Sequence, residues 1–197
     1  TEDAKLLEDL YESFKANGAT LNKDDKEKYR KLSMDLSMLT LQFDQNALKD
    51  KNRFELQITD ENELSGLPES ARDAAAMLAK SKDKNGWLFN LSAPSYIPFM
   101  RYSDKRDLRE KMYREYMSVG NKGDEFDNKD IIKKIVNIRL EIAQLMGFKN
   151  YAEYALEHTM AKNSANVYKL LNQLLEAYKP IAINEYNAVE GLSLIHI

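Results

Sequence analysis

Apolar residues recur in steps of three and four through the first fifty positions, and this spacing is the period of an amphipathic helix. The first such run ends at Gly18, which suits the left-handed position after a helix, and it comprises Leu6, Leu7, Leu10, Tyr11 and Phe14. A second run starts after Asn22, which stands as a helix N-cap three residues ahead of Asp25. The pattern therefore predicts a short helix before Gly18 and one long amphipathic helix over residues 23–50.

After the long helix the apolar period changes to two, which is typical of a strand with one solvated face. Residues 54–59 alternate in this way, and residues 87–91 do so again. The Ala-rich stretch between them, 68–80, is predicted to be a helix with Pro68 at its first position. We expect the two strands to pair and to lie on the helices, because a two-stranded ribbon alone is marginally stable.

Helical periodicity returns in the second half of the chain. Residues 103–119 carry apolar side chains on one side and dense charge on the other, which predicts a surface helix. The next helix is expected between Asn128 and Gly147, with an apolar stripe of Ile131, Ile135, Ile138, Ile142 and Leu145. Asn150 with Glu153 is typical of a capping box at the start of another helix.

A last helix is predicted from Ser164, which we expect to cap it, and its apolar stripe comprises Val167, Leu171, Leu174, Tyr178 and Ile181. Pro180 lacks a backbone N–H and clashes with the preceding turn, so we expect it to kink or break this helix near Lys179. The final seven residues, 191–197, do not continue the stripe and resemble translated vector or adaptor sequence. We therefore expect a tail that is not native to the protein.

Together these elements predict a mainly α fold of long amphipathic helices with a small two-stranded β ribbon. No repeat or low-complexity linker interrupts residues 1–190, so the sequence predicts no second domain boundary within them. The chain starts at Thr1 rather than at a Met. We interpret residues 1–190 as a helical segment that is truncated at both ends.

The charge balance argues against nucleic acid and anionic membranes as partners. Lys and Arg number 29 against 32 Asp and Glu, and no basic patch is visible, whereas phosphate binding requires an excess of Lys and Arg. No apolar run approaches the roughly 20 residues that span a bilayer. Because the chain has no Cys, it has no disulfide, no thiolate nucleophile and no Cys-ligated metal.

The sequence contains two histidines, His158 and His196, and neither lies in a His-Glu-x-x-His helix that would bring two imidazoles around zinc. A structural or surface role is the favoured interpretation of His158. The serines lack both a nucleophile elbow and a neighbouring His that could activate one, so a serine hydrolase is not expected. From its residues alone, the chain has no self-contained active site.

Two further groups of residues could suggest binding. An acidic cluster resembles a calcium loop but lacks its alternate oxygens and central Gly, so loop solvation and helix capping are favoured for Asp124, Glu125, Asp127 and Asp130. The isolated glycines Gly120 and Gly123 are explained by turn chemistry rather than by phosphate binding. An aromatic set at helical spacing favours core packing, with a peptide- or base-stacking face as the alternative, and it consists of Tyr96, Phe99, Tyr102, Tyr113 and Tyr116.

Five segments, taken in their order and spacing, resemble a known family. They are 39–50 (LTLQFDQNALKD), 63–68 (ELSGLP), 120–128 (GNKGDEFDN), 145–152 (LMGFKNYA) and 160–162 (MAK). Together they resemble the thimet-oligopeptidase family of zinc metallopeptidases, most closely its bacterial peptidyl-dipeptidase (Dcp-type) branch. The resemblance covers nearly the whole chain, from Leu21 to Glu190.

The resemblance implies that the chain is a fragment of a much longer, mainly helical enzyme that hydrolyses short oligopeptides. In this family zinc is held by a His-Glu-x-x-His helix and a further Glu, and the Glu between the two His activates the metal-bound water. No position of this sequence matches those residues, so the resemblance assigns no catalytic, cofactor-binding or metal residue to the chain. Zinc would then be a cofactor of the full-length enzyme alone, and residues 21–190 would contribute helical channel wall and scaffold.

The family resemblance and the lack of Cys together favour a cytoplasmic location. A free-standing helical module that binds a protein or peptide is the alternative hypothesis, with the aromatic set or an apolar stripe as its docking face. The start at Thr1 and the tail from Gly191 favour a fragment over this alternative. In a fragment, apolar stripes made for absent partners stay exposed to water, so we predict that the separate chain is marginally stable or prone to aggregate.

Overall fold

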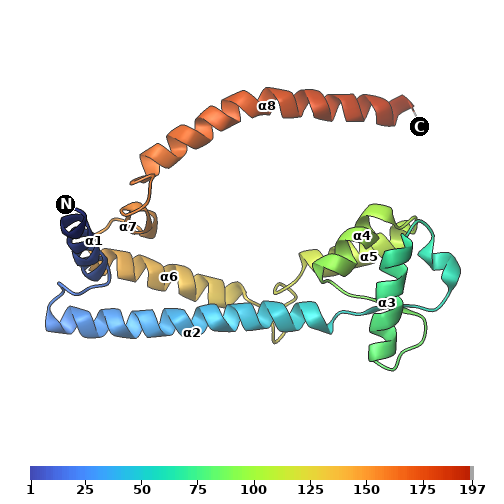
Figure 1. The fold of residues 1–197 in the computed structure, drawn as a ribbon, viewed down its shortest axis with the longest axis horizontal. Coiled ribbons are helices and arrows are strands. Elements are labelled where there is room, and N and C mark those ends of the chain that lie inside the picture. The colour runs from blue at the N-terminus through green and yellow to red at the C-terminus, as the bar shows by residue number, and fades with distance from the viewer. Residues whose placement is uncertain (196–197) are drawn as a thin grey trace. The chain divides into compact units, whose positions relative to one another are not determined.

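The computed structural model of the chain is mainly helical (Figure 1) and describes residues 1–195, with side chains described for residues 1–192. His196 and the end of the predicted foreign tail lie outside the described residues. The chain divides into two compact units, one made of Thr1–Ser33 with Ile138–Ile197 and the other of Met34–Asn137. Both boundaries fall inside helices, α2 (Lys23–Arg53) and α6 (Lys129–Leu145), which explains why no linker marks them in the sequence.

The first unit contains α1 (Glu2–Ala16), α7 (Tyr151–Leu156) and α8 (Ser164–Ile195), together with the adjoining parts of α2 and α6. Two predicted helix starts, at Asn22 and Asn150, are confirmed. The Asn22 side chain accepts a hydrogen bond from the backbone N–H of Asp25 at 2.9 Å, and the Asn150 side chain accepts one from Glu153 at 3.0 Å. The Tyr154 hydroxyl donates to the Ala16 carbonyl at 2.8 Å and so holds α7 against the end of α1.

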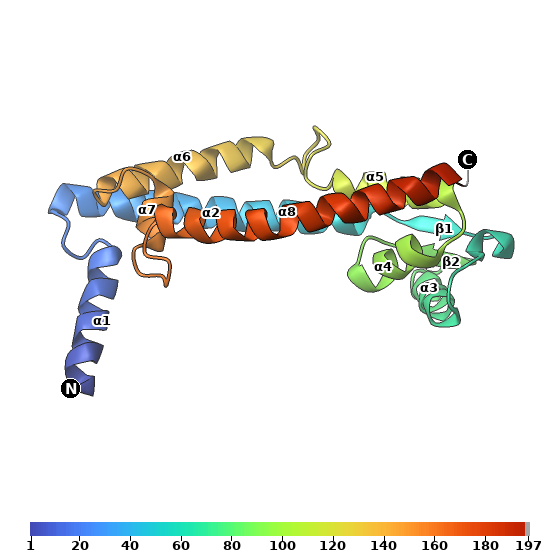
Figure 2. The same cartoon turned by 90° about the horizontal axis from the view of Figure 1, so that it is seen from above.

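One prediction about α8 is wrong. Asn163, not Ser164, caps the helix, because its side chain accepts a hydrogen bond from the N–H of Asn166 at 2.9 Å, while the Ser164 hydroxyl donates to Glu153. Pro180, where a kink or a break was predicted, lies inside α8 without breaking it: α8 is one continuous helix in Figure 2 and bends along its length in Figure 1. The missing proline N–H removes one backbone hydrogen bond, and the good helix formers on both sides of it carry the helix onward.

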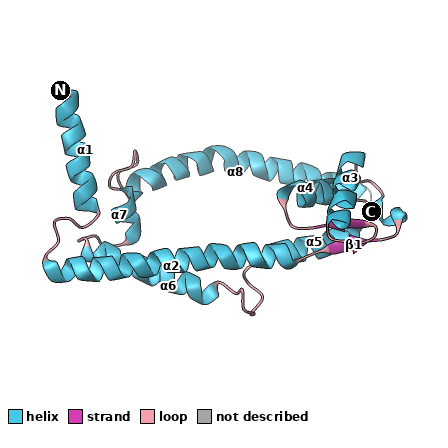
Figure 3. Cartoon of the chain, turned by 60° about the horizontal axis from the view of Figure 1, so that its bottom comes forward, coloured by secondary structure: helices cyan, strands magenta, loops and turns pink. Residues whose placement is uncertain are grey.

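The second unit holds the ribbon of strands β1 (Leu56–Ile58) and β2 (Trp87–Phe89), drawn in magenta in Figure 3. The two strands pair antiparallel with Leu56 opposite Phe89, as the alternating pattern indicated, although each strand is shorter than predicted. Between the strands lie a 3-10 turn, Glu61–Leu64, and α3 (Glu69–Ser81). Helix α3 contacts β2, so the ribbon lies on a helix as expected.

The sequence did not predict α4 (Ala93–Tyr102), which precedes the expected surface helix α5 (Arg106–Met117). The reason is that α4 contains two prolines, which usually argue against a helix. Pro94 lies in the first turn, where a missing N–H costs nothing, and Pro98 removes a single hydrogen bond from the middle of the helix. The burial of Phe99 against Phe89, with ring centroids 4.8 Å apart, compensates for that loss.

The core of the second unit forms around the ribbon and gathers side chains from β1, α3, β2, α4 and α5. Its buried members are Leu56, Ile58, Leu64, Leu67, Ala75, Phe89, Leu91, Phe99 and Met112. Each large side chain removed from water stabilises the fold by roughly 1.5–3 kcal/mol. This cluster therefore fixes the positions of the loops and helix ends around it.

Large apolar side chains in the first unit remain exposed. Leu7 and Phe14 of α1 are 70% and 66% exposed, and α8 shows the same feature along its length. Such exposure supports the prediction of marginal stability for the separate chain, which stays a prediction. None of the described helices combines the length with the apolar composition that crossing a membrane requires.

Candidate functional site

A buried polar cluster lies where the end of α2 meets the loop between α5 and α6. Asp50, in the last turn of α2, is completely buried. Its Oδ2 atom accepts a hydrogen bond from the backbone N–H of Gly120 at 2.7 Å. A carboxylate removed from water requires such donors, so this contact fixes the start of the loop on the helix.

Two cations compensate the buried charge of Asp50. The Arg53 Nε atom lies 2.7 Å from Asp50 Oδ1, and the Lys122 Nζ atom lies 3.2 Å from the same oxygen. Lys122 also contacts Glu115 at 2.7 Å, and Arg53 reaches the Asp124 carboxylate. Partial burial acts to lower the pKa of Lys122, but the hydrogen bonds to Glu115 and Asp50 outweigh it and raise that pKa.

A pair of buried asparagines continues the cluster. The Asn46 side-chain amide donates to Asn128 Oδ1 at 3.1 Å, and the Asn128 amide donates to the Phe43 carbonyl at 3.0 Å. Asn46 lies one turn before Asp50 on the same buried face of α2. Asn128 lies at the end of the loop that begins at Gly120. These contacts join two of the segments that carry the family resemblance, 39–50 and 120–128.

Two members of the acidic cluster, Asp124 and Asp127, accept hydrogen bonds from the loop backbone. Asp127 accepts hydrogen bonds from the N–H of Lys129 at 2.9 Å and from the N–H of Gly123 at 2.6 Å. The Lys129 side chain and backbone lower the pKa of Asp127 to about 2, and the Arg53 guanidinium lowers the pKa of Asp124. Over the described part of the chain, no three His, Asp or Glu side chains are grouped so that they could hold a metal ion.

His158 lies at the surface after α7. Its Nε2 atom is 3.3 Å from a carboxylate oxygen of Glu157, and 45% of its side chain is exposed. One exposed imidazole beside one carboxylate does not supply the three protein ligands that a catalytic zinc takes. Within residues 1–192, the side chains therefore do not fit a catalytic zinc.

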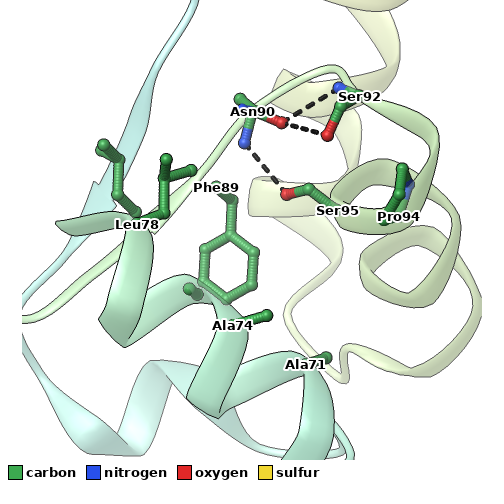
Figure 4. Close-up of a pocket in the computed structure, with 10 residues that line it drawn as sticks. Ala71, Ala74, Leu78, Phe89, Asn90, Ser92, Pro94 and Ser95 are labelled. Carbon is green, nitrogen blue, oxygen red and sulfur yellow. Dashed lines mark hydrogen bonds between the residues drawn. The ribbon is translucent and has the colours of Figure 1, made fainter. Parts of the chain in front are cut away.

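A cavity of about 220 Å³ opens between α3, β2 and the start of α4 (Figure 4). Its walls are mainly apolar and include Ala71, Ala74, Leu78 and Phe89. Asn90 lies at the polar edge, where its side chain accepts hydrogen bonds from the backbone and hydroxyl of Ser92 and its N–H donates to the hydroxyl of Ser95. The cavity could hold an apolar group, but no titratable side chain lines it.

The aromatic set does not form one exposed face. Phe99 is fully buried, and the rings of Tyr96 and Tyr116 stack on each other with centroids 4.2 Å apart. Tyr102 and Tyr113 stay about half exposed, at 46% and 50%. Core packing, the favoured interpretation, is confirmed for Phe99.

The buried cluster around Asp50 was not predicted, although the sequence holds a signal for it. Asn46 and Asp50 continue the apolar stripe of α2 after Leu39 and Phe43, in steps of four and three. A polar residue in the buried stripe of a helix requires a hydrogen-bond partner. The partner lies 70 residues further along the chain, so the helix pattern alone does not reveal it.

With these features in place, the sequence comparisons show which proteins the chain is similar to. Residues 99–193 match the model of peptidase family M3. Oligopeptidase A from Haemophilus influenzae is 37% identical over 191 residues, which cover 95% of this chain and 28% of that protein. The probable cytosolic oligopeptidase A of Arabidopsis thaliana is 39% identical over 80% of this chain and 23% of its own length.

Dipeptidyl carboxypeptidase from Escherichia coli is 28% identical over 98% of this chain and 28% of that protein. The resemblance to the thimet-oligopeptidase family is therefore confirmed. Identity is higher to oligopeptidase A than to this dipeptidyl carboxypeptidase, whose branch the motifs favoured. The chain spans little more than a quarter of the length of these bacterial relatives.

Proposed function

We propose that this chain is part of a zinc metallopeptidase that hydrolyses short oligopeptides, and that it forms helical wall and scaffold around the catalytic centre. One observation carries the proposal: 95% of the chain aligns with a protein named oligopeptidase A, of which it spans 28%. The buried Asp50 cluster fits this role. It joins segments 39–50 and 120–128, which carry the family resemblance, and its charged side chains pair with one another rather than act as an acid, base or nucleophile.

The chemical character of the residues supports the proposal that this chain is a non-catalytic part of the enzyme. Hydrolysis of a peptide by a metallopeptidase requires a metal-bound water and a general base beside it. His158 and His196 lie too far apart in the sequence to form the paired-His zinc motif. Zinc would be a cofactor of the full-length enzyme, and no catalytic, cofactor-binding or metal residue is proposed within this chain.

The proposed partners are short peptides, bound by the full-length enzyme. We propose neither nucleic acid nor a membrane as a partner, because the charge of the chain is nearly balanced and no described helix suits a bilayer. A cytoplasmic location is proposed from the relative named as a probable cytosolic oligopeptidase A. Fractionation of the source cells with an antibody against the chain tests this location.

A chimera tests the proposed function. Residues 1–190 of this chain replace the aligned segment of the Haemophilus influenzae oligopeptidase A, and the tail that we interpret as foreign is left out. We expect the chimera to cleave a fluorogenic oligopeptide, to lose this activity with a chelator and to regain it with zinc. The separate 197-residue chain should cleave nothing.

Two results would contradict the proposal. A chimera that folds, binds zinc and still leaves the peptide intact would show that this chain is no substitute for the oligopeptidase segment. Chelator-sensitive cleavage by the separate chain would show that it has a catalytic centre of its own. Metal analysis of the separate chain provides a second readout, in which less than one zinc per chain is expected.

A further inference from the structure

Helix α8 has a wide apolar stripe that is exposed to water. Leu171, Leu174, Tyr178 and Ile181 follow one another in steps of three and four, and each of them is at least 43% exposed. Polar residues such as Lys169, Gln173 and Glu176 occupy the opposite side of the helix. A helix in a protein gains most of its stability by packing such a stripe, so the stripe of α8 is built for a partner.

Glu185 gives this surface a second, more specific feature. It follows Ile181 by four residues and precedes Ala188 by three, so it lies within the register of the apolar stripe. A partner that covers the stripe also covers this carboxylate, which then needs a cation or several hydrogen-bond donors. The surface that fits α8 is therefore apolar with a basic side chain opposite Glu185.

A second copy of α8 does not offer such a surface. Parallel pairing of two copies would bring the two Glu185 carboxylates together, and like charges in contact are destabilising. Antiparallel pairing centred on Tyr178 would set Glu185 against Leu171 of the other copy, which leaves the carboxylate without a donor. A cation for Glu185 must then come from a different polypeptide segment.

The comparisons indicate where that segment comes from. The match to the peptidase family model extends through α8 to residue 193, so α8 is part of the region shared with the family. The relatives are much longer than this chain, which covers 28% of the Haemophilus influenzae oligopeptidase A. Most of the polypeptide in such a protein lies outside the aligned segment and is available to cover α8.

We propose that α8 docks, through the stripe from Leu171 to Glu185, on an apolar and basic surface formed by polypeptide that corresponds to the unaligned part of oligopeptidase A. This inference rests on the proposed function. It goes further in naming the interacting helix, the side chains that make the contact and the charge of the surface that receives them.

The chimera and the separate chain together test the docking. Leu174→Glu and Ile181→Glu place a charge in the stripe, and Gln173→Glu places the same charge on the opposite side as a control. In the chimera we expect the two stripe variants to lower the melting temperature by several degrees and the control to leave it unchanged. In the separate chain, where these side chains are exposed, all three variants should melt alike.

Hydrogen exchange of the unmodified proteins gives a measure that does not depend on the folding of any variant. The amides of α8 should exchange at least tenfold more slowly in the chimera than in the separate chain. Glu185→Gln should lower the melting temperature of the chimera alone. Rapid exchange of α8 in a folded chimera, or stripe variants without effect there, would overturn the proposal.

Two outcomes separate this inference from the proposed function. A chimera with protected α8 amides and no peptidase activity would support the docking and contradict the function, whereas an active chimera with unprotected α8 would do the reverse. Light scattering measures whether the separate chain forms a dimer, in which a second copy would cover the stripe of α8. A stable dimer of the separate chain that Leu174→Glu dissociates would overturn the proposal in favour of self-association.

Discussion

The carboxylate of Asp50 accepts a hydrogen bond from the backbone N–H of Gly120 across 70 residues of sequence, at 2.7 Å. This contact joins the last turn of α2 to the loop that begins after α5. Because Asp50 is fully buried, its charge depends on this donor and on the neighbouring cations Arg53 and Lys122. The loop is therefore held by a polar contact inside the fold rather than by apolar packing alone.

Removal of the Asp50 carboxylate should destabilise the second unit strongly. In Asp50→Ala the Gly120 N–H loses its acceptor, while Lys122 and Arg53 keep only Glu115 and Asp124 as partners. We expect a loss of about 3 kcal/mol in the free energy of unfolding, as for a buried ion pair that loses one member. Urea unfolding followed by the fluorescence of Trp87 measures it.

Asp44→Ala is the matched control for this substitution. Asp44 lies on the same helix but is exposed, so its removal should change the unfolding free energy by about 0.5 kcal/mol or less. Equal effects of the two substitutions would contradict the role given to Asp50.

Asn128→Ala should weaken the closure of the same loop. The substitution removes one buried hydrogen bond to Asn46 and one partly buried hydrogen bond to the Phe43 carbonyl. Since each net hydrogen bond contributes about 1 kcal/mol, a loss of about 2 kcal/mol is expected in urea unfolding. The exposed Asn121 of the same loop provides the comparison, and an Asn121→Ala loss as large as that of Asn128→Ala would speak against the prediction.

Two glycines with positive φ should respond differently to alanine. Gly86 has φ +79°, and a Cβ atom there would lie 2.1 Å from the Ile58 carbonyl oxygen, whereas a Cβ atom at Gly123, with φ +72°, would meet nothing within 4 Å. Gly123→Ala should cost about 1 kcal/mol for the left-handed backbone alone. Gly86→Ala should cost clearly more, because it also forces the two strands apart.

Thermal unfolding of both glycine variants provides the comparison. The melting temperature should fall further for Gly86→Ala, and the circular dichroism of the folded protein should report a disturbed ribbon in that variant. Similar melting temperatures would mean that backbone strain, and not the clash with Ile58, dominates at both positions.

Acid should destabilise the chain partly through Asp127. Its pKa is lowered from 3.8 to about 2 in the folded protein by Lys129 and by backbone N–H groups. A lowered folded-state pKa means that the ionised carboxylate stabilises the fold above pH 3.8, and this contribution is lost as the pH falls toward 2. Asp127→Asn should therefore lose less stability between pH 4 and pH 2 than the unmodified chain.

The test is the midpoint of urea unfolding measured at several pH values. Asp73→Asn serves as the control, because Asp73 is an exposed carboxylate on α3. The control should follow the acid dependence of the unmodified chain, and an Asp127→Asn variant that does the same would refute the prediction.

The separate chain should bind the dye ANS at neutral pH while it is folded. Exposed apolar side chains on α1 and α8, such as Leu7, Phe14 and Leu175, offer the surface that this dye detects. The double variant Leu174→Glu with Ile181→Glu should reduce the fluorescence of the bound dye. A folded chain that does not raise the fluorescence would count against exposed apolar stripes in solution.

Local sequence determined most of the helices and two of their starts. Steps of three and four predicted α1, α2, α5 and α6, and Asn22 and Asn150 cap their helices as expected, because these signals act within one turn of the chain. The ribbon was predicted for the same reason, since alternation is a property of successive residues. The absence of Cys and of a paired-His motif likewise follows from the sequence itself.

The helix predictions were least accurate where the chain contains proline. Pro98 and Pro180 each remove a single backbone hydrogen bond, which led us to miss α4 and to expect a kink or a break in α8, where the helix stays continuous. Whether a helix continues through a proline depends on the free energy of its remaining turns. For α4 the burial of Phe99 against the ribbon adds to the stability of the helix. That burial involves residues from another element and is not written in the local pattern.

Tertiary structure alone decided how the polar residues are used. The sequence places Asn46 and Asp50 on the apolar stripe of α2, but it does not say that Asn128 and Gly120 complete their hydrogen bonds. The reason is physical: periodicity reports on neighbours within a few residues, whereas a buried charge is compensated by whatever the folded chain brings near it. Helix positions follow from the order of residues along the chain, and the pairing of buried charges follows from the fold.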